Sequence, residues 1–182
     1  MPPSPAVRRA TLGVATLAAI VVAACRAPAV TEVEARSTGG SVRPVGSLAT
    51  PAFDSAVAAF RYYSGVDRRT RVVVRSPAEW AALWAEITRG VSPVPPLPAV
   101  DFAERMVLVA AMGTRTSGGY AIGVESVDSA GGGLRATVVE RSPGAHCFTT
   151  AALTQPLVAV VVPRAVGQVA WVERTAVVDC GP

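Results

Sequence analysis

The 182-residue sequence contains no lysine and no asparagine, so arginine supplies all 17 of its basic side chains. Charged residues make up only 16% of the chain, and the formal net charge at pH 7 is +4. Arg8 and Arg9 lie in a segment that we expect to be removed, and without them 15 arginines balance 13 acids. Because binding to a phosphate backbone requires a dense basic face, nucleic acid is excluded as an expected partner.

Histidine is nearly absent as well, since His146 is the single one. Zinc motifs that require two histidines are therefore excluded. The chain also lacks the Gly-x-Ser-x-Gly turn of hydrolases and, having no lysine, the phosphate-binding Gly-x-x-x-x-Gly-Lys loop. We therefore predict a protein that is not an enzyme and carries no metal and no cofactor. An enzyme of unrecognised type is the remaining alternative.

An uncharged apolar run from Ala10 to Ala24 follows the basic pair Arg8-Arg9. It is shorter than the about 20 residues of a spanning helix, but it is typical of the core of a signal peptide. Its end, Val22-Ala23-Ala24-Cys25, resembles the lipobox of bacterial lipoproteins. The pattern predicts a signal peptide at 1–24 and a lipid anchor on Cys25, in an exported protein held at the bacterial cell membrane or outer membrane. An ordinary secretory signal with a chance cysteine is the alternative.

The mature chain divides by composition into a tether and a domain. Residues 25–52 are rich in Gly, Ser, Thr, Pro and Ala and show no apolar periodicity, which is typical of a flexible linker. Residues 53–182 are expected to form one domain. Because 51% of the whole chain is apolar, there is enough apolar surface for this domain to bury a core.

One helix is predicted in this domain. Ser76-Pro77-Ala78-Glu79 is a capping box, with Ser76 before the first helical residue and Glu79 able to reach back to it. The apolar residues that follow are spaced at i, i+3, i+4 and i+7, namely Trp80, Leu83, Trp84 and Ile87. Gly90 provides the stop. We expect both tryptophans to lie in the core.

The rest of the domain has the pattern of strands. Six are expected, each bounded by turn residues, at 71–75, 106–112, 120–127, 134–140, 157–162 and 169–174. A weaker seventh is expected at 57–63. The fold class is therefore predicted to be α+β, with a mainly antiparallel β-sheet of about six strands packed with one amphipathic helix.

The chain has three cysteines, and lipidation would consume Cys25. Cys147 and Cys180 then remain as an even pair in an oxidising compartment, which favours a disulfide. The alternative is a thiol–imidazole pair formed by Cys147 with His146. Adjacent residues on a strand point to opposite faces, however, which disfavours that pairing.

Several short motifs occur in an order that resembles a known family. Glu79-Trp80 and Leu83-Trp84 are followed by Val100-Asp101-Phe102, a valine-rich strand, the segment Gly113 to Tyr120, and Thr154-Gln155-Pro156 before a last valine-rich strand. This order, over about residues 55 to 165, is similar to the C-terminal domain of PrcB-type protease-complex subunits. The resemblance implies an exported, non-catalytic subunit that supports a protease complex, and it brings no catalytic residues with it.

Two places are candidates for binding. Gly118 and Gly119 precede Tyr120, and they permit either a tight turn or a backbone nest for an anion, which Arg115 could assist. Arg68, Arg69 and Arg71 form a basic stretch before the helix. That stretch is expected either to keep an edge strand from pairing or to dock an acidic partner or anionic lipids and glycans of the envelope.

These observations predict a membrane-tethered, non-catalytic accessory lipoprotein that stabilises an envelope protein partner, with a protease as the partner that the resemblance implies. The second hypothesis is a small-ligand or anion binder that uses the Gly118-Gly119 loop.

Overall fold

The computed structural model describes residues 46–47 and 49–181. The predicted signal peptide, Cys25 and most of the predicted tether lie outside these residues. The elements in chain order are α1 (Pro51–Ala58), β1 (Arg69–Val74), α2 (Pro77–Ile87), β2 (Arg105–Met112), β3 (Ala121–Ala130), β4 (Gly133–Pro143), β5 (Leu157–Pro163) and β6 (Val169–Val178).

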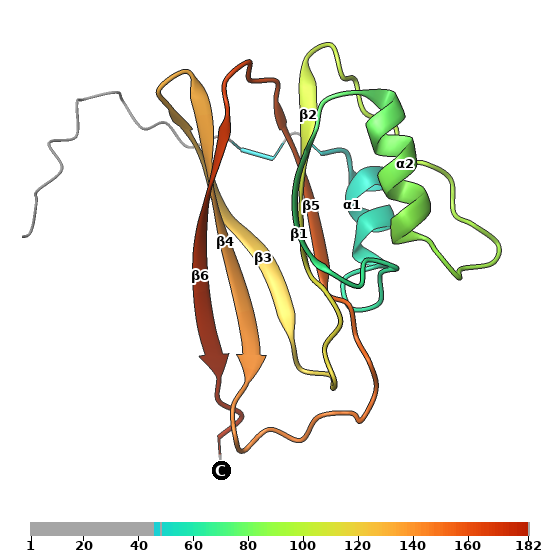
Figure 1. Cartoon of the computed structure of the whole chain (residues 1–182), viewed down its shortest axis with the longest axis vertical. Coiled ribbons are helices and arrows are strands. Elements are labelled where there is room, and N and C mark those ends of the chain that lie inside the picture. Colours follow the sequence, from blue (N-terminus) through green and yellow to red (C-terminus); the bar gives the residue numbers. More distant parts are fainter. Residues whose placement is uncertain (1–45, 48, 182) are drawn as a thin grey trace, which may run out of the picture. The chain divides into compact units, whose positions relative to one another are not determined.

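The strands form two sheets, ordered β1-β2-β5 and β3-β4-β6 (Figure 1). Pairing is antiparallel throughout except between β4 and β6, which run parallel. The predicted α+β class with mainly antiparallel pairing is therefore confirmed. The structure differs in dividing the six strands between two sheets and in adding a second helix.

The strand predicted at 57–63 is wrong, because this region begins in the helix α1. Thr50 caps that helix, and its side chain accepts a hydrogen bond from the Phe53 N–H at 3.2 Å. Phe53, Val57 and Phe60 are buried at helical spacing. Beyond the helix, Tyr63 makes only an isolated bridge with Gln155. The aromatic and β-branched residues here pack as a helical stripe rather than as a strand.

Helix α2 forms as predicted, with both hydrogen bonds of the capping box present. Trp80 and Trp84 are buried, and each indole N–H donates to a backbone oxygen of the proline-rich loop, at 2.8 Å to Pro98 and 3.1 Å to Pro95. Trp80 stacks on Phe53 with the ring centroids 5.7 Å apart. The tryptophans therefore join the two helices and the loop in one apolar core, as expected.

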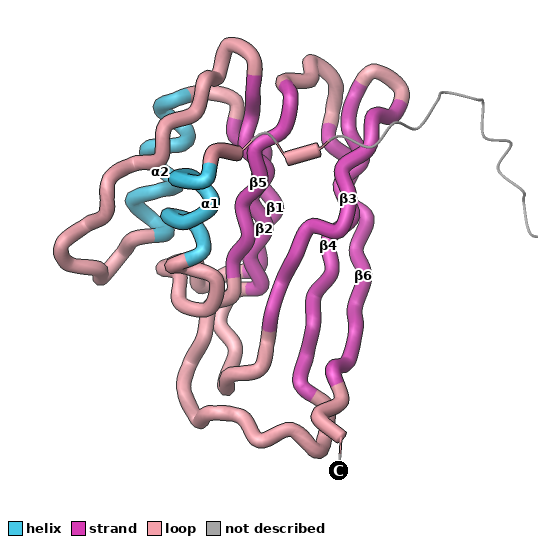
Figure 2. The backbone as a smooth tube through the Cα atoms, turned by 180° about the vertical axis from the view of Figure 1, so that it is seen from behind, coloured by secondary structure: helices cyan, strands magenta, loops and turns pink. Residues whose placement is uncertain are grey.

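Strand β2 has an apolar core on each of its two faces. Val107, Val109 and Ala111 pack with residues of both helices, whereas Met106 and Leu108 pack with residues of β3 and β4. The helices thus cover one face of the β1-β2-β5 sheet, and the β3-β4-β6 sheet covers the other (Figures 1 and 2). The continuous apolar run of β2 is explained by this burial on both faces.

The predicted disulfide is confirmed. Cys147 and Cys180 are bonded, with their Cα atoms 5.0 Å apart and a sequence separation of 33. The bond joins the loop that follows β4 to the end of the chain just beyond β6. Both cysteines are thereby held in a bridge that leaves no thiol on Cys147.

Candidate functional site

Charged side chains lie between the two sheets, at the edge strand β1. Val72 and Val74 pack toward the helices, so the alternate residues Arg69 and Arg71 point to the second sheet. There they contact Glu140 of β4 and Glu173 of β6. We call Arg69, Arg71, Arg115, Glu140 and Glu173 the inter-sheet ion cluster.

Arg71 is the most enclosed arginine of this cluster. Its Nε lies 2.8 Å from one oxygen of Glu173, and a terminal nitrogen donates to Glu140. Another terminal nitrogen donates to the Ala111 backbone oxygen at 2.9 Å. Its side chain is 11% exposed and that of Glu140 is 12% exposed. Such a pair is strongly oriented, and loss of either partner would leave an uncompensated charge in a partly buried place.

The ion pairs shift the pKa of Glu173 below its ordinary value. The principal cause is the hydrogen bond from Arg71, opposed by burial and reinforced by the charges of Arg71 and Arg69. For Arg71 burial acts to lower the pKa, but the hydrogen bonds that it donates to Glu173 and Glu140, together with their negative charges, outweigh burial, and the pKa is raised. Both side chains therefore remain ionised at neutral pH.

Arg115 reaches the same cluster from the loop after β2. Its terminal nitrogen lies 3.8 Å from the second oxygen of Glu140, and its guanidinium lies 5.7 Å from the centre of the Tyr120 ring. The Nε atom of Arg115 is buried without a hydrogen-bond partner among the described residues. Three guanidinium groups therefore meet two carboxylates, and Arg115 is the least neutralised of the three.

The basic stretch predicted from the sequence thus divides in two. Arg69 and Arg71 are committed to holding the sheets together through Glu140 and Glu173. Arg68 is exposed, and within the described residues it forms no ion pair. Of these three, only Arg68 has a guanidinium fully available to another molecule, while Arg69 has a side chain that is 51% exposed.

Sequence reasoning missed Glu140 and Glu173. A signal for Glu173 was present, because it shares the alternating face of Val169 and Trp171. An acid on an otherwise apolar face requires a cationic partner. The partner itself could not be predicted, since β1 and β6 are about 100 residues apart in the sequence.

The Gly118-Gly119 loop lies against the segment between β4 and β5. The Gly118 N–H donates to the Thr150 backbone oxygen at 2.9 Å, and a Cβ on Gly118 would lie 2.5 Å from the Thr150 hydroxyl oxygen. Gly119 has φ +85° and lies close to Pro143 and Thr149. Close packing and a positive φ account for both glycines. One amide of the hypothetical anion nest is already in use.

The thiol–imidazole alternative has no geometric basis, since Cys147 is in the disulfide. His146 is 77% exposed, and its Nδ1 lies 3.6 Å from a carboxylate oxygen of Asp179. In the described part of the chain, no three His, Cys, Asp or Glu side chains gather in a way that could hold a metal. Within that same part, neither helix is long and apolar enough to span a membrane.

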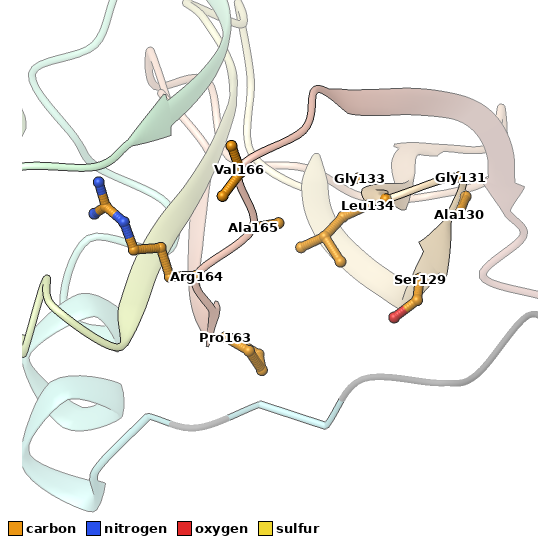
Figure 3. Close-up of a pocket in the computed structure, with 10 residues that line it drawn as sticks. Ser129, Ala130, Gly131, Gly133, Leu134, Pro163, Arg164, Ala165 and Val166 are labelled. Carbon is orange, nitrogen blue, oxygen red and sulfur yellow. The ribbon is translucent and has the colours of Figure 1, made fainter.

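A hollow of about 480 Å³ lies between the β3–β4 turn and the loop that joins β5 to β6 (Figure 3). Its lining is small and apolar, with Ala130, Leu134, Ala165 and Val166 among the residues drawn. The guanidinium of Arg164 donates to the backbone oxygens of Arg75 and Phe102 instead. The hollow therefore presents no charged group that could orient a ligand.

Together these features define a small α+β domain whose inter-sheet ion cluster joins its two sheets. Residues 106–163, from β2 to β5, match the family model described as PrcB C-terminal. The resemblance predicted from the sequence is confirmed over this segment, which is about a third of the chain. No curated protein and no solved structure matches the chain.

The matched segment contains Arg115, the two glycines, Tyr120 and Glu140. Arg68, Arg69, Arg71, Glu173 and Cys180 lie outside it. The inter-sheet ion cluster therefore joins residues inside the family match to residues outside it. The family points to an accessory domain associated with a protease complex rather than to a catalytic one.

Proposed function

We propose that this protein is a non-catalytic accessory lipoprotein, held at the bacterial cell envelope through Cys25, that binds and stabilises a partner protein such as a protease. The match of residues 106–163 to the PrcB C-terminal family is the observation that carries the proposal. The chemistry of the described residues agrees with it, because His146 is exposed and Cys147 is bridged. Catalysis requires a positioned acid, base or nucleophile, and Cys147 in its disulfide cannot act as a nucleophile beside His146.

A domain without chemistry can act on a partner by mass action. Binding to the native state stabilises it by RT ln(1 + [L]/Kd), or about 2.7 kcal/mol at a hundredfold excess over Kd. Attachment of both proteins to one membrane raises the effective concentration, so modest affinity is sufficient. The proposed lipid on Cys25 would therefore contribute to function and not only to location.

Crosslinking in native membranes, followed by identification of the captured protein, tests this proposal. The wild-type protein should partition into the detergent phase and capture one envelope partner, whose level should fall when the gene is deleted. The Cys25→Ala variant should remain in the aqueous phase and capture much less. Identical partition of the two forms would refute the lipid anchor.

The His146→Ala variant is the matched control for catalysis. It should restore the partner as well as wild type does, since the proposal assigns His146 no role. Turnover of a peptide, ester or glycan by the purified protein, abolished by His146→Ala, would refute the accessory role.

A second candidate function, binding of a small anion, is favoured by the buried and unpaired Nε of Arg115. A carboxylate beside Arg115 and Tyr120 would satisfy that N–H and offset the surplus positive charge of the cluster. Calorimetric titration with acetate and phosphate tests it, with Arg115→Gln as the variant that should lose any heat of binding.

A further inference from the structure

The outer edge of β6 is open. β6 is the last strand of the β3-β4-β6 sheet, and within residues 46–47 and 49–181 no strand lies on its other side (Figures 1 and 2). The Gly144 N–H donates to the Val178 backbone oxygen at 2.8 Å, so Val178 directs its backbone groups toward β4. Because alternate residues direct theirs to opposite sides in a parallel pair, Glu173, Thr175 and Val177 present theirs to the outside.

This edge lacks the features that usually keep an edge strand unpaired. Exposed edges are commonly short, charged, bulged or broken by proline. β6 is 10 residues long and pairs with β4 without a register shift. It contains no proline and no glycine, and both of its charges are engaged, Glu173 by Arg69 and Arg71 and Arg174 by Glu125 at 3.2 Å.

The other three edge strands differ from β6 in this respect. β1 has only 6 residues, β3 has a register shift between Val124 and Ser126, and β5 has only 7 residues and ends at Pro163. The domain therefore protects three of its edges and leaves the longest regular one open. Such an edge is a template for pairing with another chain.

Apolar side chains lie at the C-terminal end of this edge. Val177 is 70% exposed and Val178 is 45% exposed. Phe148 is fully exposed, and the Cys147–Cys180 disulfide ties its loop to the end of β6. Apolar anchors beside an open strand edge are the combination that recognises an extended peptide.

The charge beside the edge indicates what kind of segment fits. The half-exposed guanidinium of Arg69 reaches Glu173 on β6, and exposed Arg68 precedes it on the chain. Arg69, Arg71 and Arg115 together bring three guanidinium groups to the two carboxylates of Glu140 and Glu173. An acidic side chain on the bound segment would be attracted to this surplus.

We propose that the β6 edge (Val169–Val178) together with Phe148 is the docking surface of this protein, on which the partner adds an extended, acidic and apolar segment as a fourth strand. This inference rests on the proposed function and names the surface and the chemistry that the partner must have. Apolar residues of the segment lie against Val177 and Phe148, and an acidic residue faces the half-exposed Arg69. Backbone hydrogen bonds to Glu173, Thr175 and Val177 hold the segment in register.

Photo-crosslinking of the full chain in native membranes tests this assignment, with p-benzoylphenylalanine in place of Phe148. Thr175→Pro removes an outward N–H without removing a hydrogen bond to β4, and Thr175→Ala is the matched control that keeps this N–H. We expect Thr175→Pro to lower the crosslinked yield at least about tenfold, a typical loss for a residue central to an interface. Thr175→Ala should stay within about twofold of the parent, since exposed substitutions have small effects. The crosslinked peptide should come from an extended segment with an acidic residue.

Hydrogen exchange provides a second measurement in case Thr175→Pro does not fold. A synthetic peptide of the crosslinked segment, added to the intact lipoprotein in micelles, should slow exchange at the outward amides of Thr175 and Val177. It should leave the amides of β2 unchanged. Absence of that protection would overturn the assignment.

The outcomes separate this inference from the proposed function. If the parent captures a partner and Thr175→Pro captures it equally well, the β6 edge is not the docking surface, while the accessory role stands. If the crosslink joins two copies of this chain, the occupant is a second copy and the assignment to a partner is overturned. If the parent captures nothing while the partner's level still depends on the gene, the docking surface is wrong. If that dependence is also absent, both proposals fail.

Discussion

Strands β2 and β6 are built from similar residues and lie in opposite environments. β2 reads RMVLVAAM and β6 reads VAWVERTAVV, so valine and alanine dominate both. Every residue of β2 after Arg105 is buried, whereas every residue of β6 from Glu173 to Val178 is exposed. The difference comes from sheet order, because β2 is central and covered on both faces while β6 is at an edge. In this chain, therefore, apolar composition alone does not tell a buried strand from an exposed one.

The largest expected effect comes from shortening one apolar side chain in each of the two strands. Leu108→Ala in β2 should lower the free energy of unfolding by about 3–5 kcal/mol, since Leu108 is 0% exposed and packs with residues of β3 and β4. Val178→Ala in β6 should change it by less than about 0.5 kcal/mol. Denaturant unfolding of both variants measures the difference. Equal losses would show that β6 is buried.

The disulfide sharpens the comparison, because it ties the end of β6 and has no counterpart at β2. Reduction should lower the free energy of unfolding by about 2–4 kcal/mol, mainly by freeing a long loop in the unfolded chain. Before reduction, neither Cys147 nor Cys180 should react with an alkylating reagent. Quantitative alkylation of Cys147 in the native protein would contradict the bond and restore the thiol-enzyme alternative.

Substitutions in the inter-sheet ion cluster measure how strongly β6 is joined to the β1-β2-β5 sheet. Arg71→Met should lower the free energy of unfolding by about 2 kcal/mol. This is below the 3–5 kcal/mol typical of a fully buried pair because Glu173 is partly exposed. Arg68→Met is the matched control and should have almost no effect on stability, since Arg68 is exposed. Equal melting temperatures for the two variants would show that the cluster does not join the sheets.

The sequence was informative where structure depends on neighbouring residues. Ser76 and Glu79 started α2 as predicted, because a capping box is satisfied within one turn. The pairing of Cys147 with Cys180 was predicted from the even number of cysteines left after the expected lipidation of Cys25 and from the expected oxidising compartment, and the disulfide is present. The likeness to the PrcB C-terminal family was also readable from short motifs.

What could not be predicted depends on contacts between distant residues. The strand expected at 57–63 was wrong because Phe53, Val57 and Phe60 bury a helical stripe against Trp80 and Trp84, and this packing overrides local β propensity. The division into two sheets and the parallel pairing of β4 with β6 are decided by a crossover. The open edge is likewise a property of strand order, so only the structure reveals it.

The smallest expected effect concerns pH. The pKa of Glu173 is lowered in the folded protein, chiefly by the hydrogen bond from Arg71. The ion pair therefore stabilises the fold above the pKa of an unfolded glutamate, about 4.3, and this contribution is lost as the pH falls through the lower folded value. Arg71 adds no pH dependence below pH 12, because its pKa is raised from an already high value.

Thermal unfolding between pH 7 and pH 3 measures this contribution, with Glu173→Gln as the variant. The melting temperature of the variant should lie below that of wild type at pH 7, and the two should converge toward pH 3. Glu79 is the matched comparison, since its pKa is also lowered, first by the Arg75 backbone N–H, at the start of α2. Glu79→Gln should reduce the acid sensitivity in the same direction without loosening β6. A constant difference in melting temperature between each variant and wild type across this range would show that the fold holds neither carboxylate ionised. The contact between β6 and the β1-β2-β5 sheet would then not depend on charge.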